Sequence, residues 1–145
     1  PDAVARRFWT EGIREAAPAA AEHGVCFCLE NVGVSFANDP RDIADIIDAI
    51  GSPGVGVYYD PGNAFGTGYD PLEGIRILGA KIKQVHVKER NGTYVGDGDV
   101  PWTDIIPALR NVGYDGWLVF ETAATDDPRK AAEINLERTR KLLDT

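Results

Sequence analysis

The sequence predicts an α/β fold built on a parallel sheet. Three observations lead to this prediction: a leading helical pattern, four repeats of strand, loop and helix after it, and turn residues between the repeats. Strands that alternate with helices form right-handed βαβ units, which place the strands in parallel. The 145 residues are 43% hydrophobic and 26% charged, which is ordinary for a folded domain. We expect one domain, or half of one.

The first elements follow from helix periodicity and capping. Residues 4–23 are rich in alanine and contain no run of β-branched residues, which favours a helix. The short apolar run 25–30 is typical of a buried strand. Asp39 and Pro40 provide an N-cap and a first helical position for a helix over 40–50, whose isoleucines share one face.

The second and third units repeat this order. A strand over 55–60 leads into a glycine-rich loop over 61–68, and Asp70 with Pro71 begins a short helix that ends near Leu78. The third strand covers 82–87. A long polar loop, 88–100, follows it.

The last unit completes the pattern. Pro101 begins a helix that continues to about Asn111, and the fourth strand covers 117–121. Asp127, followed by proline, caps a final helix in which apolar and charged positions alternate.

Composition excludes several classes of function. The 15 basic and 23 acidic residues give a formal charge of −8, and the basic residues are scattered, which disfavours nucleic-acid binding. No stretch approaches the ~20 apolar residues of a membrane helix, and the charged, alanine-rich start is unlike a signal peptide. We therefore expect no nucleic-acid partner and no membrane partner.

The chain has two cysteines, Cys26 and Cys28, in one apolar run. A disulfide between residues two apart in a strand would be strained. We expect two small buried side chains in a reducing, cytoplasmic compartment.

Polar residues interrupt all four strands at or near their carboxyl ends. Residues two apart in a strand share a face, so parity sorts the strand residues into two sets. One set is almost wholly apolar, as expected of a face covered by helices: Val25, Phe27, Leu29, Val55, Val57, Tyr59, Val85, Val87, Leu118 and Phe120. The other set contains the four polar residues: Glu30, Asp60, His86 and Glu121. We expect these four to meet at the carboxyl edge of the sheet, where such folds bind ligands.

This group of side chains indicates a metal site. Three carboxylates and one imidazole, with no basic residue among them, would repel one another unless a divalent cation lay between them. Oxygen and imidazole ligands suit Mn²⁺, Mg²⁺, Co²⁺ or Zn²⁺ better than a metal selected by thiolates.

Each residue taken alone also has a structural interpretation. Asp60 before Pro-Gly is typical of a turn, and His86 alone would more often be a hydrogen-bonded core residue. Glu30 and Glu121 could each cap the loop that follows. The shared face and the shared end of the sheet favour the metal site.

Several segments together resemble the sugar phosphate isomerase/epimerase family, which are xylose isomerase-like TIM barrels and include the ketose 3-epimerases. The resemblance covers about residue 24 to the end. It rests on these motifs: Cys28-Leu29-Glu30-Asn31, Tyr59-Asp60-Pro61-Gly62-Asn63, Val85-His86-Val87-Lys88-Glu89, Gly96-Asp97-Gly98-Asp99-Val100-Pro101-Trp102 and Gly113-Tyr114-Asp115-Gly116-Trp117 leading to Phe120-Glu121.

The resemblance implies a function and a set of roles. It implies that Glu30, Asp60, His86 and Glu121 bind one divalent metal, with Mn²⁺ the expected ion. It also implies that Glu30 and Glu121 are the acid/base pair of an isomerase or epimerase acting on a ketose or ketose phosphate through a metal-stabilised enediolate. The expected partner is therefore a small-molecule sugar or sugar phosphate.

The substrate is less well defined. Ketose 3-epimerases typically carry a second histidine shortly after the metal aspartate, where this chain has Asn63. Asn63, Lys88 and Arg90 are the candidates to contact substrate. Lys88 or Arg90 could hold a phosphate or a carboxylate, and for these two residues solvated loop charges are the alternative. The loop 96–98 has acidic neighbours, which favours a lid or turn over a phosphate cradle.

Other functions stay open at this point. Inosose dehydratases and hydroxypyruvate isomerases belong to the same family, and a non-catalytic half-barrel is a further alternative. Apurinic endonucleases need extra histidine ligands, and this chain has only His23 and His86.

A (β/α)₈ barrel takes about 250 residues. Residues 1–145 supply a leading helix and four units, and the chain starts at Pro1 within a helical pattern and contains no methionine. We expect the carboxyl-terminal half of a barrel, either part of a longer chain or a half that pairs with a second copy as a homo-oligomer.

Overall fold

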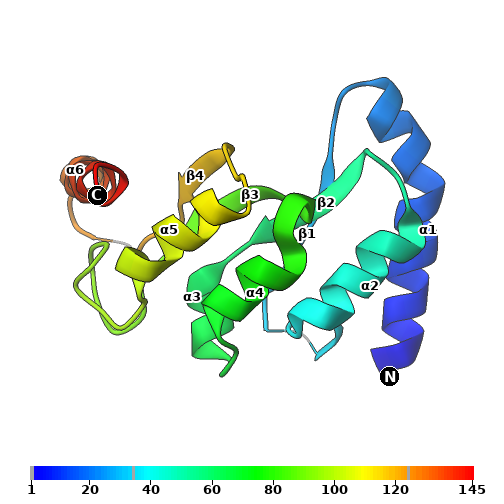
Figure 1. Cartoon of the computed structure of the whole chain (residues 1–145), viewed down its shortest axis with the longest axis horizontal. Coiled ribbons are helices and arrows are strands. Elements are labelled where there is room, and N and C mark those ends of the chain that lie inside the picture. Colours follow the sequence, from blue (N-terminus) through cyan, green and yellow to red (C-terminus); the bar gives the residue numbers. More distant parts are fainter. Residues whose placement is uncertain (1, 34, 124) are drawn as a thin grey trace.

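The computed structural model describes residues 2–33, 35–123 and 125–145, and it contains the predicted parallel sheet (Figure 1). The sheet has four strands in the order β1-β2-β3-β4, and each neighbouring pair is parallel. The strands are β1 (Phe27–Glu30), β2 (Val55–Tyr59), β3 (Ile82–Val87) and β4 (Trp117–Phe120). Sequential strands lie side by side, as in a segment of a (β/α) barrel.

The helices follow the strands in the predicted order, and α1, α2, α4 and α5 stand in a row along one side of the sheet (Figure 1). The α-helices are α1 (Asp2–Glu22), α2 (Pro40–Ile50), α3 (Pro61–Gly66), α4 (Pro71–Leu78), α5 (Trp102–Asn111) and α6 (Pro128–Leu143). Single 3₁₀ turns occupy Ser35–Ala37 and Gly79–Lys81. None of these helices combines the length and the apolar character needed to cross a bilayer.

Three predicted helix starts are confirmed, and they share one arrangement. Asp39, Asp70 and Asp127 each precede a proline, and each side chain accepts a hydrogen bond from a backbone N–H of the first turn, at 2.8, 2.8 and 3.0 Å. The carboxylate satisfies an N–H that the helix leaves free, and proline lacks the N–H that would need a partner. These caps fix where α2, α4 and α6 begin.

The core lies between the sheet and the row of helices. Along the two central strands the predicted apolar face is buried: Val57, Tyr59, Val85 and Val87 are at most 2% exposed. Isoleucines of α2, α4 and α5 pack against this face. The polar face of the strands is therefore left for the functional residues.

At the edges of the sheet the predicted covered face is confirmed only in part: Leu29 is 7% exposed, but the other residues of this face are less buried. The first strand begins at Phe27, and Val25 and Phe27 are 55% and 38% exposed. β1 and β4 each have a neighbour on one side only, so the helices cover them less completely. Leu118 and Phe120 of β4 are accordingly half-buried.

The predicted burial of both cysteines is also wrong. Cys26 is exposed and Cys28 is half-buried, and both are free thiols. Their parity places them on the face opposite the helices, where the described residues form no covering layer over β1. Burial is nevertheless strong enough at Cys28 to raise its pKa to about 12.

The predicted glycine-rich loop is partly a helix, α3. Pro61 occupies its first turn, and the Asp60 carboxylate accepts the backbone N–H of Asn63 at 2.8 Å. These N-terminal signals outweigh the poor helix propensity of glycine. Gly62 is needed for packing, because a Cβ there would lie 3.0 Å from the carbonyl oxygen of Lys88.

Candidate metal centre

Four polar side chains converge where the carboxyl ends of the strands meet. Glu30 ends β1, Asp60 follows β2, His86 lies near the end of β3, and Glu121 follows β4. One ligand atom from each of the four lies within 4.8 Å of the others. The structure therefore brings together all four residues that strand parity selected.

The imidazole of His86 lies at the centre of the group. Its Nδ1 is 3.1 Å from Glu30 Oε1, 3.4 Å from Glu121 Oε2 and 3.8 Å from Asp60 Oδ2. The ring packs against Tyr58, with ring centres 3.9 Å apart and planes inclined by 38°. One nitrogen thus faces three carboxylates that come from three other strand ends.

Asp60 is the most buried of the four residues, with 0% exposure. Its Oδ1 caps α3, whereas Oδ2 is buried and has no hydrogen-bond partner, although Lys88 Nζ lies 3.4 Å away. Burial raises the pKa of Asp60 above its ordinary value, against the opposing effects of the Asn63 N–H, Lys88 and His86. A buried carboxylate oxygen without a hydrogen bond is costly, and a cation bound between the four residues would compensate it.

Asn31 holds Asp60 in place, and the sequence analysis did not assign it this role. It is 1% exposed, its Nδ2 donates to the carbonyl oxygen of Asp60, and its Oδ1 accepts the Asp60 N–H, both at 2.8 Å. This reciprocal pair joins the end of β1 to the end of β2. One feature of the sequence indicates this role: Asn31 is polar, although its parity places it on the apolar face of the strand, which the helices cover.

Replacing Asn31 by alanine is expected to destabilise the protein by about 2–4 kcal/mol, because two buried backbone groups of Asp60 would lose their partners. Asn38→Ala is the matched control, since its Oδ1 accepts one exposed N–H, that of Gly33. Urea unfolding measures both free energies. Equal losses for the two variants would contradict the assigned role of Asn31.

Lys88 places an ammonium group against the carboxylates. Its Nζ lies 2.8 Å from Glu121 Oε2, 3.4 Å from Asp60 Oδ2 and 3.4 Å from Asn63 Oδ1. The hydrogen bond from Lys88 lowers the pKa of Glu121. Burial favours a lower pKa for Lys88 itself, but Glu121 and Asp60 outweigh burial and raise it. Both shifts favour the charged forms of the Lys88–Glu121 ion pair.

Arg90 is held against the backbone of α3. Its Nε donates to the carbonyl oxygen of Gly62 at 3.1 Å, and its guanidinium occupies the space that a side chain at Gly66 would need. Arg90 thus braces the helix that Asp60 caps. Of the three residues predicted to contact substrate, Lys88 contacts two of the carboxylates and Asn63 contacts Lys88, whereas Arg90 contacts the backbone of α3.

The loop 88–100 has a defined shape, and Glu89 organises it. Its two carboxylate oxygens accept the backbone N–H groups of Arg90, Val100 and Gly96, at 3.2, 3.1 and 2.7 Å. From α6, the buried Asn135 accepts the Val95 N–H at 2.9 Å. No local motif predicts this role of Glu89, because these contacts depend on the path of the loop.

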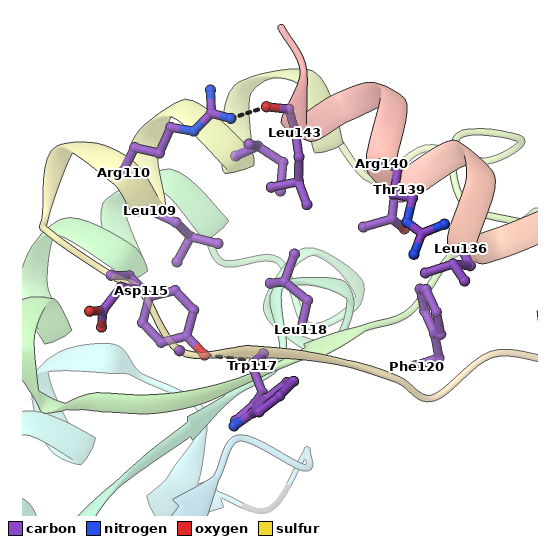
Figure 2. A pocket seen from close by; sticks show the side chains of 13 residues that line it. Leu109, Arg110, Asp115, Trp117, Leu118, Phe120, Leu136, Thr139, Arg140 and Leu143 are labelled. Atoms are coloured by element: carbon purple, nitrogen blue, oxygen red, sulfur yellow. Dashed lines mark hydrogen bonds between the residues drawn. The ribbon is translucent and has the colours of Figure 1, made fainter.

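A separate cavity of about 430 Å³ lies between β4, α5 and α6 (Figure 2). Its walls are mainly apolar, and Arg110 lies at its rim with its guanidinium hydrogen-bonded to the carbonyl oxygen of Leu143. None of the four converging residues is among its described lining residues. The candidate metal centre is therefore a different site, on the other face of the sheet.

The four converging residues fit a divalent cation. Three carboxylates and an imidazole suit Mn²⁺, Mg²⁺, Co²⁺ or Zn²⁺, and Oδ2 of Asp60, which accepts no hydrogen bond, faces His86 in the same group. The arrangement defines a segment of a parallel α/β barrel with a carboxylate–imidazole centre at its carboxyl edge.

Comparison with known proteins identifies the family. The model of the xylose isomerase-like TIM barrel family matches residues 1–142, so the chain belongs to that family. The fold likeness extends to solved structures: D-allulose 3-epimerase from Methylomonas sp. superposes with a TM-score of 0.87 at 19% identity, over 94% of this chain and 55% of that one.

Two curated relatives carry the names of enzymes. D-psicose 3-epimerase of Ruminiclostridium cellulolyticum is 31% identical over 115 residues, which is 77% of this chain and 39% of that protein. Inosose dehydratase of Bacillus thuringiensis is 24% identical in an alignment 143 positions long that covers 83% of this chain and 47% of that protein. The chain thus spans less than half the length of these relatives.

Proposed function

We propose that this chain is the carboxyl-terminal half of a metal-dependent epimerase or isomerase that acts on a ketose or ketose phosphate. The observation that carries the proposal is the convergence of Glu30, Asp60, His86 and Glu121, with a buried oxygen on Asp60 that accepts no hydrogen bond. The family and the named epimerase relatives support it. Mn²⁺ is the ion we expect.

A bound divalent cation would stabilise the negative charge that develops on substrate oxygens when a proton leaves the neighbouring carbon. In this proposal Glu30 and Glu121 move that proton: one carboxylate removes it, and the other returns it on the opposite face of the carbon. They extend from β1 and β4, at opposite edges of the sheet, and meet across His86. Asp60, fully buried and fixed by Asn31, takes no part in the proton transfer: it holds the cation and caps α3.

Lys88 and Asn63 are proposed to contact the substrate. The Lys88 ammonium and the Asn63 amide lie beside the carboxylates, at the rim of the centre. An ammonium there suits a hydroxyl, a carboxylate or a phosphate of the substrate. Arg90 contributes by fixing α3, which carries Asn63.

Proton exchange tests this function most simply. D-psicose incubated with the protein and Mn²⁺ in deuterated water is expected to gain deuterium at C3, observed by NMR, and to form its C3 epimer. Removing the cation with a chelator should stop both reactions. Binding of Mn²⁺ without exchange for any ketose or ketose phosphate tested, in a protein that contains this chain and all eight strands of the barrel, would contradict an epimerase and favour a non-catalytic domain.

A dehydratase is the second candidate, favoured by the inosose dehydratase relative, whose alignment covers 83% of this chain. Both reactions begin with removal of a proton beside a carbonyl group, so the same carboxylates would serve. Release of water from an inosose, followed by the absorbance of the unsaturated product, distinguishes the dehydratase from the epimerase.

A further inference from the structure

We infer that Lys88 is an internal counter-cation, which occupies the carboxylates of the centre when no metal is bound and competes with the metal for them. The inference rests on the proposed metal site. It assigns to Lys88 a role in setting the affinity of the site, in addition to any contact with substrate.

The distances show direct competition for the same atoms. Lys88 Nζ contacts Glu121 Oε2 and Asp60 Oδ2, and these are the oxygens that face His86 Nδ1 at 3.4 and 3.8 Å. A divalent cation bound by His86 and both oxygens would use electron pairs to which the ammonium is now directed. The divalent cation would also lie close to the positively charged Lys88 ammonium, and this repulsion is unfavourable at a partly buried site.

The surroundings of Lys88 support this role. The side chain is 27% exposed and extends from the end of β3, on the same face as His86. Among the described residues, Lys88 is the one basic side chain that forms an ion pair with a carboxylate of the centre. The other ion pairs of lysine and arginine join residues outside the centre. Two of the three clustered carboxylates, those of Asp60 and Glu121, therefore have this ammonium as their counter-charge.

Asn63 offers the ammonium a second position. Its Oδ1 lies 3.4 Å from Nζ and does not belong to the converging group. When a cation takes the carboxylate oxygens, Nζ can keep this neutral acceptor and turn away from Glu121. Lys88 would thus keep the metal-free site folded and yield to the metal without a change in the backbone.

Lys88→Met tests the inference, because methionine keeps the length of the side chain and removes the charge. Titration calorimetry with Mn²⁺ at neutral pH and low salt is expected to give a dissociation constant at least about tenfold lower than that of the wild type. Lys141→Met is the matched control, since it removes a lysine paired with a glutamate at 2.7 Å on exposed α6. Its Mn²⁺ affinity should be unchanged.

A second variant and a second measurement show whether a change in Mn²⁺ binding comes from the lost charge or from misfolding of the Lys88→Met variant. Lys88→Gln can still donate a hydrogen bond to Glu121 and should also bind Mn²⁺ more tightly. Both neutral variants should melt at a lower temperature than the wild type without metal and gain more from Mn²⁺.

The possible results separate the two proposals. Equal or weaker Mn²⁺ binding by both neutral variants, with normal binding by the wild type, would overturn the role of Lys88 and leave the metal site intact. No Mn²⁺ binding by the wild type would overturn the metal site and this inference with it.

Discussion

Asp60→Asn is expected to weaken Mn²⁺ binding on the order of 100-fold or more, since even the loss of a group behind a metal ligand costs 10- to 100-fold. The free energy of unfolding should not fall. Asparagine keeps an oxygen to cap α3 through the Asn63 N–H, and the change removes a buried charge whose pKa burial already raises. Calorimetry with Mn²⁺ and urea unfolding measure the two effects separately.

Asp70→Asn is the matched control for this change. Asp70 also precedes a proline, and its side chain caps α4 through the Leu72 N–H at 2.8 Å, but it lies outside the converging group. Its Mn²⁺ affinity should equal that of the wild type. If Asp60→Asn also bound Mn²⁺ normally, Asp60 would not be a ligand.

Glu121→Gln is expected to reduce epimerisation by about 10³-fold, within the range for losing a positioned acid or base. Glutamine keeps an oxygen for the hydrogen bond from Lys88 but cannot accept the substrate proton. Interconversion of D-psicose and its C3 epimer, followed by NMR, measures the loss. Calorimetry on the same variant shows how much of the loss comes from weaker metal binding.

Glu137→Gln is the control for that experiment. Glu137 also pairs with a lysine, at 2.7 Å, on the exposed surface of α6. This variant should retain full activity. If Glu121→Gln, saturated with Mn²⁺, epimerised at the wild-type rate, Glu121 would not carry the proton.

The convergence of the four polar residues could be predicted from the sequence because it follows from the period of a strand. Residues two apart share a face, and the ends of parallel strands meet at one edge, so strand parity alone groups Glu30, Asp60, His86 and Glu121. The helix starts at Asp39, Asp70 and Asp127 were predictable for a similar reason, since capping depends on residues next to one another in the chain.

The features that were missed depend on neighbours distant in the sequence. The Asn31 bonds to Asp60 join two strands, and the Glu89 bonds follow the path of a loop. The exposure of Cys26 and Phe27 depends on the position of β1 at the edge of the sheet. Helix α3 is the exception, because its signals, Pro61 and the cap at Asp60, are local and compete with the low helix propensity of its glycines.

Anomalous diffraction at the manganese edge tests the central claim most directly. Crystals of the protein grown with MnCl₂ should show one strong peak in the centre, within about 2.0–2.3 Å of a donor atom of Glu30, Asp60, His86 and Glu121, and Lys88 Nζ should have moved away from Glu121. Crystals at saturating Mn²⁺ with no peak there, or with the peak bound by other residues, would contradict the metal site.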